Sequence, residues 1–323
     1  IPLYRQEKEW EALGLRLSRA TMSNWLLIVY RDWLVHIVHR LKLELLKQRY
    51  LHIDETHVQV LKEPGRKNTS DSYMWVYCSI RDAVNPIRYF EYQPGRSGKY
   101  PEAFLREYEG YIHTDAYSGY NAVSGVKRCL CYTHLRRAFV DALPKDIHNS
   151  EASKPAEAIL RLNQLFNIES ELEALPPDQK KKERLIREKP LLEAFWSWAE
   201  KSAIGELPKS KLSKAFHYAL NNREGFWNYL EDGNCSISNS LAENCIRPFV
   251  IGRKNWLFSG SPKGAEASAG IYTLVETAKA NGLAPMKYIK YILSDMPGSA
   301  FLEHPEYLDD YLPWNPLVKE FCR

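Results

Sequence analysis

The chain has 323 residues, of which 45% are hydrophobic, and its 44 Lys and Arg against 40 Asp and Glu leave a net charge of +4. This length predicts about two domains with buried cores, and the mildly basic balance suits a nucleic-acid partner without establishing one. Neither a membrane span nor a signal peptide is expected, because no run of about 18 apolar residues occurs. The six cysteines lack the spacing of a disulfide framework, so reduced thiols in a cytoplasm are expected.

Residues 1–48 are predicted to form a helical unit. One helix spans Tyr4–Leu13, Gly14 ends it, and Ser18 caps a second helix whose apolar residues recur every three or four positions up to Leu45. Two helices joined by a short turn match helix-turn-helix geometry. In that case the DNA-facing residues would be Arg16, Arg19, Thr21, Ser23 and Asn24. The alternative, favoured by the wide apolar stripe, is a helical hairpin that packs on the catalytic domain or forms a dimer.

The segment LHIDETHVQV is predicted to be a strand that carries Asp54. An acid is out of place in such a β-branched run, which singles this residue out. Because side chains alternate along a strand, His52, Asp54 and Thr56 share one face. We expect the strand to end at the Asp-Glu-Thr sequence, which would place Asp54 near the edge of a sheet.

Two further strands, a helix and a fourth strand are expected next. MWVYCSI and IRYFEYQ read as strands joined by the turn RDAVNP, residues 97–108 read as a helix, and YIHTDA reads as a strand that carries Asp115. The loop QPGRSGKY is not a phosphate-binding loop, because Gln93 and Tyr100 stand where that motif needs glycine and Ser or Thr. We expect Arg96 and Lys99 either to contact a DNA backbone or to belong to a plain surface loop.

Residues from about 140 to 235 are predicted to be helical, because apolar residues recur at helical spacing between proline breaks. The stretch between Asp115 and Glu243 is too long for one strand and one helix, so we expect an inserted helical subdomain. The KKKER run at 180–184 is predicted to be a solvated helix face rather than a DNA contact.

Glu243 begins an apolar-periodic helix in SNSLAENCIRPFVIGRKNWLF, with Arg247 on the same face and Pro248 as a boundary or kink. The residues that follow combine cations, an amide and an aromatic ring: Arg253, Lys254, Asn255 and Trp256. Such a mixture suits phosphate binding and base stacking at a frayed DNA end. The alternative for Trp256 is a place in the core. The tail after residue 283 is predicted to be a short helix and a Pro- and acid-rich segment, to which we assign no chemistry.

Cys131 and His134 form a C-x-x-H pair in CYTHLRRAF, followed by Arg136 and Arg137, which could bind phosphate. A zinc ion would need two further ligands. Cys129 and Cys78 follow no ligand pattern, so zinc is not expected in this chain. We expect His134 to lie near the active site and to orient a phosphate or a water molecule. The alternative is a structural strand-to-helix turn.

Carboxylates from two strands and a helix can converge on two divalent metal ions, and basic residues follow the third acid. This combination indicates phosphodiester chemistry on nucleic acid. At these places the chain resembles transposases of the IS66 type, within the wider DDE group whose catalytic domain is ribonuclease H-like. The resemblance extends over nearly the whole chain, including HIDETHVQVLKEPGR, YIHTDAYSGYNAV, CYTHLRRAF and AENCIRPFVIGRKNWLFSGSPKGAEASAG.

The resemblance implies that Asp54, Asp115 and Glu243 are the catalytic triad and hold two Mg²⁺, for which Mn²⁺ can substitute. It implies hydrolysis that frees a 3′-OH at each transposon end, then direct attack of that 3′-OH on target DNA by a homodimer or a larger assembly. Asn239, Asn244 and Arg247 would flank the site. Family members often carry an acid two residues before the position of Ser240, where this chain has Ser238. This difference puts in doubt a supporting role for that position near the site, but it does not affect the triad.

The implied fold is α/β: a ribonuclease H-like mixed sheet flanked by helices, interrupted by an all-helical insertion. The predicted parts are an N-terminal helical unit (1–48), the catalytic domain in two pieces (49–140 and 236–282), the insertion (141–235) and a C-terminal appendage (283–323). The zinc-binding and coiled-coil regions that precede this block in the family are expected to be missing. Two other functions stay open: a ribonuclease H-like nuclease or resolvase that does not join DNA, and a catalytically decayed DNA-binding protein.

Overall fold

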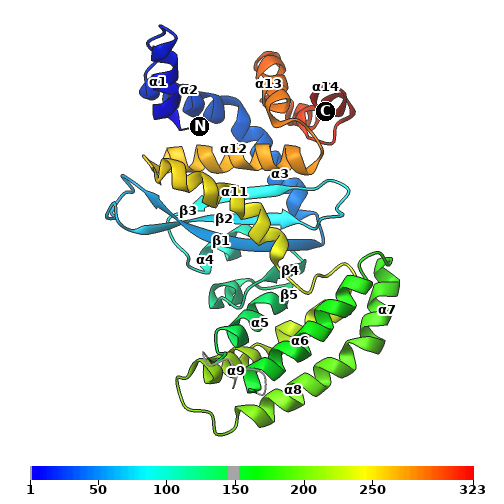
Figure 1. Ribbon diagram of the computed structural model, residues 1–323. Coiled ribbons are helices and arrows are strands. Elements are labelled where there is room, and N and C mark those ends of the chain that lie inside the picture. The colour runs from blue at the N-terminus through cyan, green and yellow to red at the C-terminus, as the bar shows by residue number, and fades with distance from the viewer. Residues whose placement is uncertain (1, 145–152) are drawn as a thin grey trace. The chain divides into compact units, whose positions relative to one another are not determined.

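The computed structural model describes residues 2–144 and 153–323, and it divides the chain into two compact units. The first unit comprises Ile1–Tyr108 and Leu241–Arg323, and the second comprises Glu109–Ser240. Ile1 lies outside the described residues. So do residues 145–152, which fall at the start of the expected insertion. The chain is mixed α/β (Figure 1). The ribonuclease H-like assignment and the five-part division stay predictions.

The first unit is built on an antiparallel sheet of β1 (Tyr50–Val60), β2 (Asp71–Ser79) and β3 (Arg88–Gln93), with β2 in the centre. The short strand β6 (Phe258–Ser259) pairs in parallel with the end of β1. The strands expected at β2 and β3 are confirmed. The expectation that β1 ends just after Asp54 is wrong, because the strand continues through Val58 and Val60, whose buried side chains keep it in the sheet.

Two helices pack against one face of this sheet, α11 (Ser240–Trp256) and α12 (Pro262–Ala280), as Figure 1 shows. The contact is apolar: the sheet provides Val58, Val60, Met74, Val76, Cys78, Phe90 and Tyr92, and the helices provide Ala242, Ile246, Phe249, Ala265 and Ala269. The small alanines allow the helices to lie close to the strands. The helix expected at Glu243 is therefore present, and it continues through Pro248 rather than ending there.

Helix α12 also covers the outer edge of β3. The backbone N–H groups of Phe90 and Arg88 donate to the hydroxyls of Thr273 and Thr277, at 2.8 and 3.0 Å. An edge strand with unpaired amides is a template for unwanted strand pairing. The two threonines satisfy these amides and so close that edge of the sheet.

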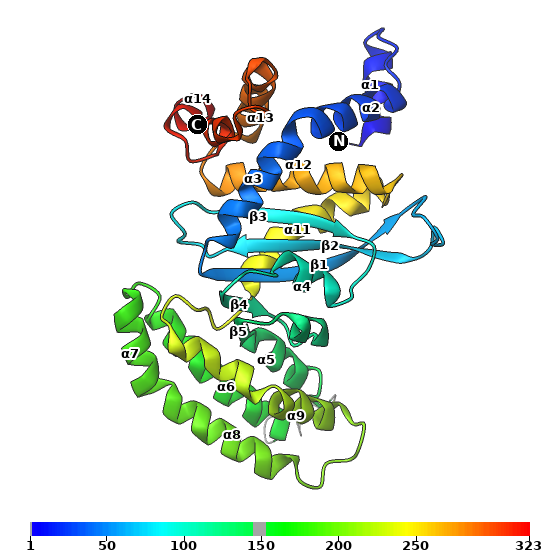
Figure 2. The same ribbon diagram turned by 180° about the vertical axis from the view of Figure 1, so that it is seen from behind.

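The opposite face of the sheet contacts α3 (Val35–Leu46) and α4 (Lys99–Phe104), seen from behind in Figure 2. The Phe104 ring stacks on Tyr77 with the ring centroids 3.6 Å apart, and Lys42 Nζ lies 3.9 Å from the centroid of the Phe104 ring. The helix expected over residues 97–108 is shorter than predicted. It ends at Phe104, because Leu105 leaves helical geometry at φ −102° and ψ 18°.

The helical nature of the N-terminal segment is confirmed. Helix α1 (Leu3–Ala12) stops before Gly14, whose φ of +84° suits glycine. Ser18 caps α2 (Arg19–Val29) by accepting a hydrogen bond from the Thr21 amide at 3.1 Å. A π-helical turn, η1 (Tyr30–Leu34), joins α2 to α3 within the predicted long helix. Whether these helices read DNA stays a prediction.

The C-terminal segment contains α13 (Pro285–Asp295), the 3₁₀ turns η5 (Met296–Gly298) and η6 (Pro305–Tyr311), and α14 (Pro316–Cys322). Tyr311 is buried, and its hydroxyl donates to Asp295 at 2.8 Å. An ion pair of 2.6 Å joins Arg40 of α3 to Asp309. Among the described helices, we find none with the length and apolarity that crossing a membrane requires.

The second unit combines a pair of parallel strands with a helical bundle. Strand β4 (Gly110–Thr114) pairs with β5 (Val126–Leu130). The sequence did not predict β5, because Lys127 and Arg128 obscure its apolar pattern. A 3₁₀ turn, η2 (Ser118–Ala122), lies between the strands. The later elements are α5 (Tyr132–Val140), α6 (Lys154–Glu171), α7 (Pro177–Arg187), α8 (Lys189–Ala203), α9 (Lys211–Asn221), α10 (Arg223–Trp227) and the 3₁₀ turn η4 (Asn228–Glu231).

A buried arginine connects several parts of this bundle. Arg184 of α7 is fully buried and pairs with both carboxylate oxygens of Glu169, at 2.6 and 2.8 Å. It also donates to the backbone carbonyls of Tyr229, Asp232 and Cys235, at 3.1, 3.1 and 2.9 Å. The prediction of a solvated face at 180–184 is therefore wrong for Arg184, because buried acceptors surround the guanidinium.

Glu188, next to this pair, makes the stability of the protein depend on pH. Burial, and then the charge of Glu169, raises the pKa of Glu188 from 4.5 to about 8. Between pH 4.5 and about 8 the folded chain holds a proton that the unfolded chain releases. This group therefore lowers the free energy of unfolding by up to about 1.4 kcal/mol per pH unit as the pH rises through that window.

We expect Glu188→Gln to remove this dependence, since glutamine keeps an acceptor for the Tyr229 hydroxyl, 2.6 Å away. Relative to the wild type, the variant should gain stability steadily from pH 5 to pH 8. Urea titrations at several pH values measure the effect. The exposed Glu193 of α8 provides the control, because Glu193→Gln should leave the pH profile unchanged. Parallel profiles for wild type and Glu188→Gln would contradict the prediction.

Candidate functional site

In the first unit, Asp54 lies in the middle of a long strand. It is paired in register with Val76 of β2 and is partly buried. Its position two residues from Thr56 and four from Val58 puts it on the face that α11 covers. The predicted sharing of a face by His52, Asp54 and Thr56 fits this alternation. A mid-strand position holds the carboxylate on a rigid element, which a catalytic group needs.

Glu243 lies in the first turn of α11 and is partly buried. Two residues further on, Cys245 is hydrogen-bonded to Cys78 of β2. Burial, and then this hydrogen bond, raises the pKa of Cys78, and the charge of Asp54 acts in the same direction. Cys78 is thus close enough to sense both Cys245 and Asp54. The first unit therefore brings the start of the Glu243 helix to the part of the sheet that carries Asp54.

Asp115 belongs to the second unit and directly follows β4. Its carboxylate accepts a hydrogen bond from the Tyr117 amide at 3.0 Å. Arg128 of β5 holds the backbone here, donating to the carbonyls of Asp115 and Tyr117 at 2.6 and 2.8 Å and to the Thr114 hydroxyl at 2.7 Å. Arg128 was not predicted as a site residue. A cation inside a strand is the signal that could have revealed it.

Tyr218 of α9 is a second residue near Asp115 that the sequence did not reveal. Burial, and then the charge of Asp115, raises the pKa of the Tyr218 hydroxyl. Its hydroxyl, neutral at pH 7 even at the ordinary tyrosine pKa, therefore stays protonated well above that pH and can donate a hydrogen bond. Nothing in the helical pattern of α9 separates Tyr218 from a core tyrosine, so sequence reasoning could not have selected it.

The C-x-x-H pair lies where β5 leads into α5. Cys131 precedes the helix, and its backbone N–H donates to Thr114 at 3.1 Å. The Cys131 sulfur accepts the backbone N–H of Asn239 at 3.1 Å. Asn239 is itself buried. Both contacts of Cys131 fit the alternative interpretation of the C-x-x-H pair, a structural strand-to-helix turn. His134 is partly buried in the first turn of α5.

The predicted DNA contacts of the first unit differ in how they are held. Arg96 pairs with Glu55 of β1 at 2.6 Å, and Lys99 Nζ lies 5.0 Å from the centroid of the Tyr100 ring. Arg253 donates to the backbone carbonyl of His57 and, at 3.2 Å, to the Thr56 hydroxyl. The exposed residues of the predicted set in this unit are Arg16, Arg19, Asn24, Lys99, Asn244, Arg247, Lys254 and Asn255.

Trp256 packs against the core rather than standing in solvent, with its ring centroid 5.3 Å from that of Phe249. In the second unit, Arg136 donates to Asn163 at 2.8 Å, whereas Arg137 is exposed. Arg137 is thus the member of this pair with a side chain open to a phosphate.

A pocket of about 460 Å³ lies between the end of α11 and the far end of β1, within the first unit. Its lining residues are His57, Gln59, Thr69, Asp71, Arg253, Lys254 and Leu257. Leu257 is exposed and has a φ of +65°, an uncommon conformation for a non-glycine residue. Two cations with polar neighbours suit a phosphate-containing ligand better than an apolar one.

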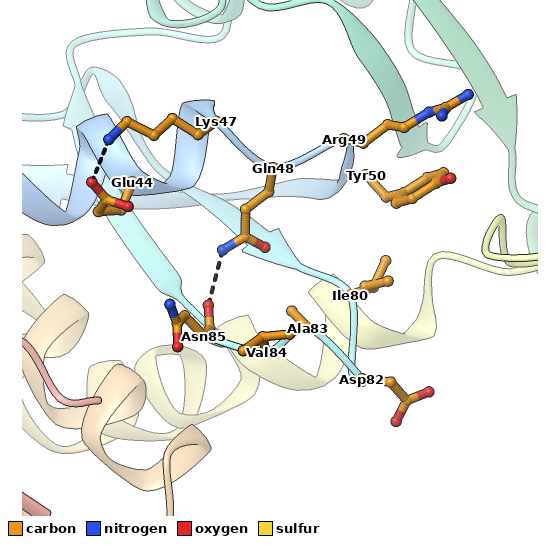
Figure 3. A pocket seen from close by; sticks show the side chains of 10 residues that line it. All are labelled: Glu44, Lys47, Gln48, Arg49, Tyr50, Ile80, Asp82, Ala83, Val84 and Asn85. Carbon is orange, nitrogen blue, oxygen red and sulfur yellow. Dashed lines mark hydrogen bonds and ion pairs between the residues drawn. The ribbon is translucent and has the colours of Figure 1, made fainter. Parts of the chain in front are cut away.

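A second pocket of the first unit, of about 370 Å³, lies between the end of α3 and the turn that joins β2 to β3 (Figure 3). Lys47 pairs with Glu44 at 2.7 Å, and Gln48 donates to the Asn85 carbonyl at 2.9 Å. The lining includes none of the predicted site residues. Asp54 and Glu243 are therefore not part of this pocket.

The sequence of the chain is similar to one family model and to three curated proteins. The family model "Transposase IS66 family" matches residues 1–267. Three similar proteins come from Sinorhizobium fredii (strain NBRC 101917 / NGR234): the uncharacterized proteins y4qI, y4hP and y4jD. Their identities to this chain are 28, 26 and 26%, over 98, 97 and 98% of the chain and 59, 59 and 63% of their own lengths. The chain thus spans about three fifths of these relatives. No solved structure matches.

Proposed function

Since the chain belongs to the IS66 family of transposases, we propose that it catalyses DNA transposition by metal-assisted phosphoryl transfer. In this proposal one strand is hydrolysed at each end of a mobile element, and the freed 3′-OH attacks target DNA directly. The observation that supports it best is the common sheet face shared by Asp54 and the helix of Glu243. Synapsis of two ends would require at least a dimer on DNA.

We assign Asp54, Asp115 and Glu243 as the residues that would hold two Mg²⁺. The donor set fits, because all three are carboxylates and Mg²⁺ prefers oxygen ligands. Bound there, the ions would activate the attacking oxygen and stabilise the leaving oxygen. Glu243 lies in the first turn of α11, so a helix rather than a loop would hold it toward an ion. Arg128 holds the backbone around Asp115 by donating to the carbonyls of Asp115 and Tyr117.

Basic residues of the first unit would position the DNA. Arg253 and Lys254 line the larger pocket, and Arg247 is exposed one turn after Glu243 on α11. Phosphate contacts of this kind set the register of DNA without reading its sequence. Each contact also makes affinity fall with salt concentration, because binding releases counterions.

A joining assay tests the proposal. Labelled duplexes that end in the terminal sequences of the element that encodes the chain, already cut at the 3′ end, are incubated with the chain, a supercoiled plasmid and Mg²⁺. We expect labelled DNA to become covalently joined to the plasmid, and EDTA to prevent this.

The products distinguish the three candidate functions. Joined DNA excludes a nuclease that only cuts. Cleavage of uncut duplexes without joining would favour the nuclease or resolvase. Binding of the duplexes with neither reaction, at all Mg²⁺ and Mn²⁺ concentrations, would favour a decayed DNA-binding protein and overturn the proposal.

A further inference from the structure

Three side chains that commonly bind metals meet in the interior of the second unit. His113, Cys129 and Cys235 are each about 1% exposed. One ligand atom from each lies within 4.8 Å of the other two. His113 of β4 and Cys129 of β5 are direct neighbours in the parallel register. Cys235 comes from the segment that precedes α11, so the tertiary structure alone brings it to the two strands.

Backbone contacts hold this segment in place beside the strands. The Ser236 amide donates to His113 Nε2 at 2.9 Å, and the Tyr132 amide donates to the Ile237 carbonyl at 3.0 Å. Arg184 donates to the Cys235 carbonyl at 2.9 Å. The three candidate ligands are therefore preorganised, which lowers the conformational cost of binding an ion.

The donor set selects the kind of ion. Two thiolates and an imidazole match Zn²⁺, whereas Mg²⁺ prefers oxygen ligands. Two thiolates also neutralise the charge of a divalent cation, which suits a buried position. We propose that His113, Cys129 and Cys235 bind a zinc ion that ties the segment before α11 to the β4–β5 pair. The fourth position would go to water, as in other zinc sites with three protein ligands.

In the structure these three side chains make contacts that a cation could replace. His113 Nε2 accepts the Ser236 amide, and the thiols of Cys129 and Cys235 are hydrogen-bonded to each other. Zinc binding at Nε2 would release the Ser236 amide toward the thiolate sulfurs, which accept hydrogen bonds. Because the thiols must lose protons, zinc affinity should rise with pH.

This site is distinct from the C-x-x-H pair that drew attention in the sequence. Cys131 Sγ accepts the Asn239 amide, and Cys129 groups with His113 and Cys235 instead. The sequence therefore gave no reason to expect zinc here, since the three residues follow no zinc-ligand spacing. The inference goes beyond the proposed function, because the zinc site is structural and shares no residue with the carboxylates.

The first test measures metal content. The full chain, saturated with Zn²⁺ and then dialysed against metal-free buffer without a chelator, should retain about one zinc per chain. Replacing the zinc by Co²⁺ should give the thiolate-to-cobalt absorption of a tetrahedral site. His113→Gln, Cys129→Ser and Cys235→Ser should each lose both signals. Cys131→Ser, Cys322→Ser and Asp54→Asn should keep them, so the result does not depend on whether transposition is observed.

A second test avoids variants that fail to fold. The unaltered chain is alkylated with and without Zn²⁺ in urea just below its unfolding transition, where local opening exposes buried thiols, and peptide mass spectrometry locates the modified cysteines. We expect zinc to protect Cys129 and Cys235 and to leave the modification of Cys245 unchanged. Failure of the folded wild-type chain to retain zinc, equal alkylation in both conditions, or loss of zinc in Cys131→Ser but not in Cys235→Ser would overturn the proposal.

Discussion

Replacing Asp54 with asparagine is expected to lower the rates of strand cleavage and strand joining by about 10³-fold or more. The amide keeps the size of the side chain but removes the charge that would hold a divalent cation. Such an ion contributes several kcal/mol to the stabilisation of the transition state, and each 1.36 kcal/mol corresponds to a factor of ten in rate. Single-turnover assays on labelled DNA measure the rates, and fluorescence anisotropy should show unchanged DNA binding.

The other two acids and a matched control complete this experiment. Asp115→Asn and Glu243→Gln should have the same effect as Asp54→Asn. Asp82→Asn makes the same chemical change at an exposed position in the turn between β2 and β3, and it should leave both rates unchanged. Strand joining near the wild-type rate in any of the three acid variants would refute the triad.

Replacing Arg184 with alanine is expected to destabilise the second unit by about 3–5 kcal/mol. The change would remove a bidentate pair and three hydrogen bonds to carbonyls, and it would leave Glu169 without its main counter-charge in a buried position. Urea titration measures the total effect. Hydrogen exchange on peptides from residues 153–240 shows whether the loss is confined to this unit.

Arg187 provides the control on the same helix. It pairs with Glu171, but both side chains are substantially exposed, at 35 and 61%. Exposed ion pairs contribute about 0–1 kcal/mol, so Arg187→Ala should have a small effect. Equal effects of the two substitutions would show that Arg184 acts as an ordinary surface charge and would contradict its role in connecting the bundle.

Local chemistry explains which elements the sequence predicted well. Gly14 and Ser18 marked the first helix boundary correctly, because a C′ glycine and an N-cap serine act through their own backbones. The end of β1 was misplaced, because its continuation depends on pairing with β2 and β6 and on burial against α11. The strand β5 was missed because Lys127 and Arg128 obscure its apolar pattern, and only the structure shows that Arg128 donates to the backbone after β4.

The residues of the candidate site also fall into two groups, those that the local sequence reveals and those that only the packing of distant elements reveals. Asp54, Asp115 and Glu243 could be selected from the sequence because an acid in an apolar strand, or at the start of an amphipathic helix, is unusual in its local context. Tyr218 could not be selected, because its proximity to Asp115 arises only after α9 has packed. The cation at Arg128 would have been a signal only if β5 had first been recognised as a strand. Only the structure therefore shows that these two residues lie near Asp115.

The sequence by itself determined the family, the strands that carry or precede Asp54 and Asp115, the helix that carries Glu243, and the choice of these residues for catalysis. These features depend on residue type and on spacing within one element. Only the tertiary structure decided that Arg184 is buried and that His113, Cys129 and Cys235 meet, because these residues come from elements far apart in the chain. Hydrophobic burial leaves an apolar pattern within each element but does not specify which elements meet, since it is non-directional and depends on the total apolar area removed from water.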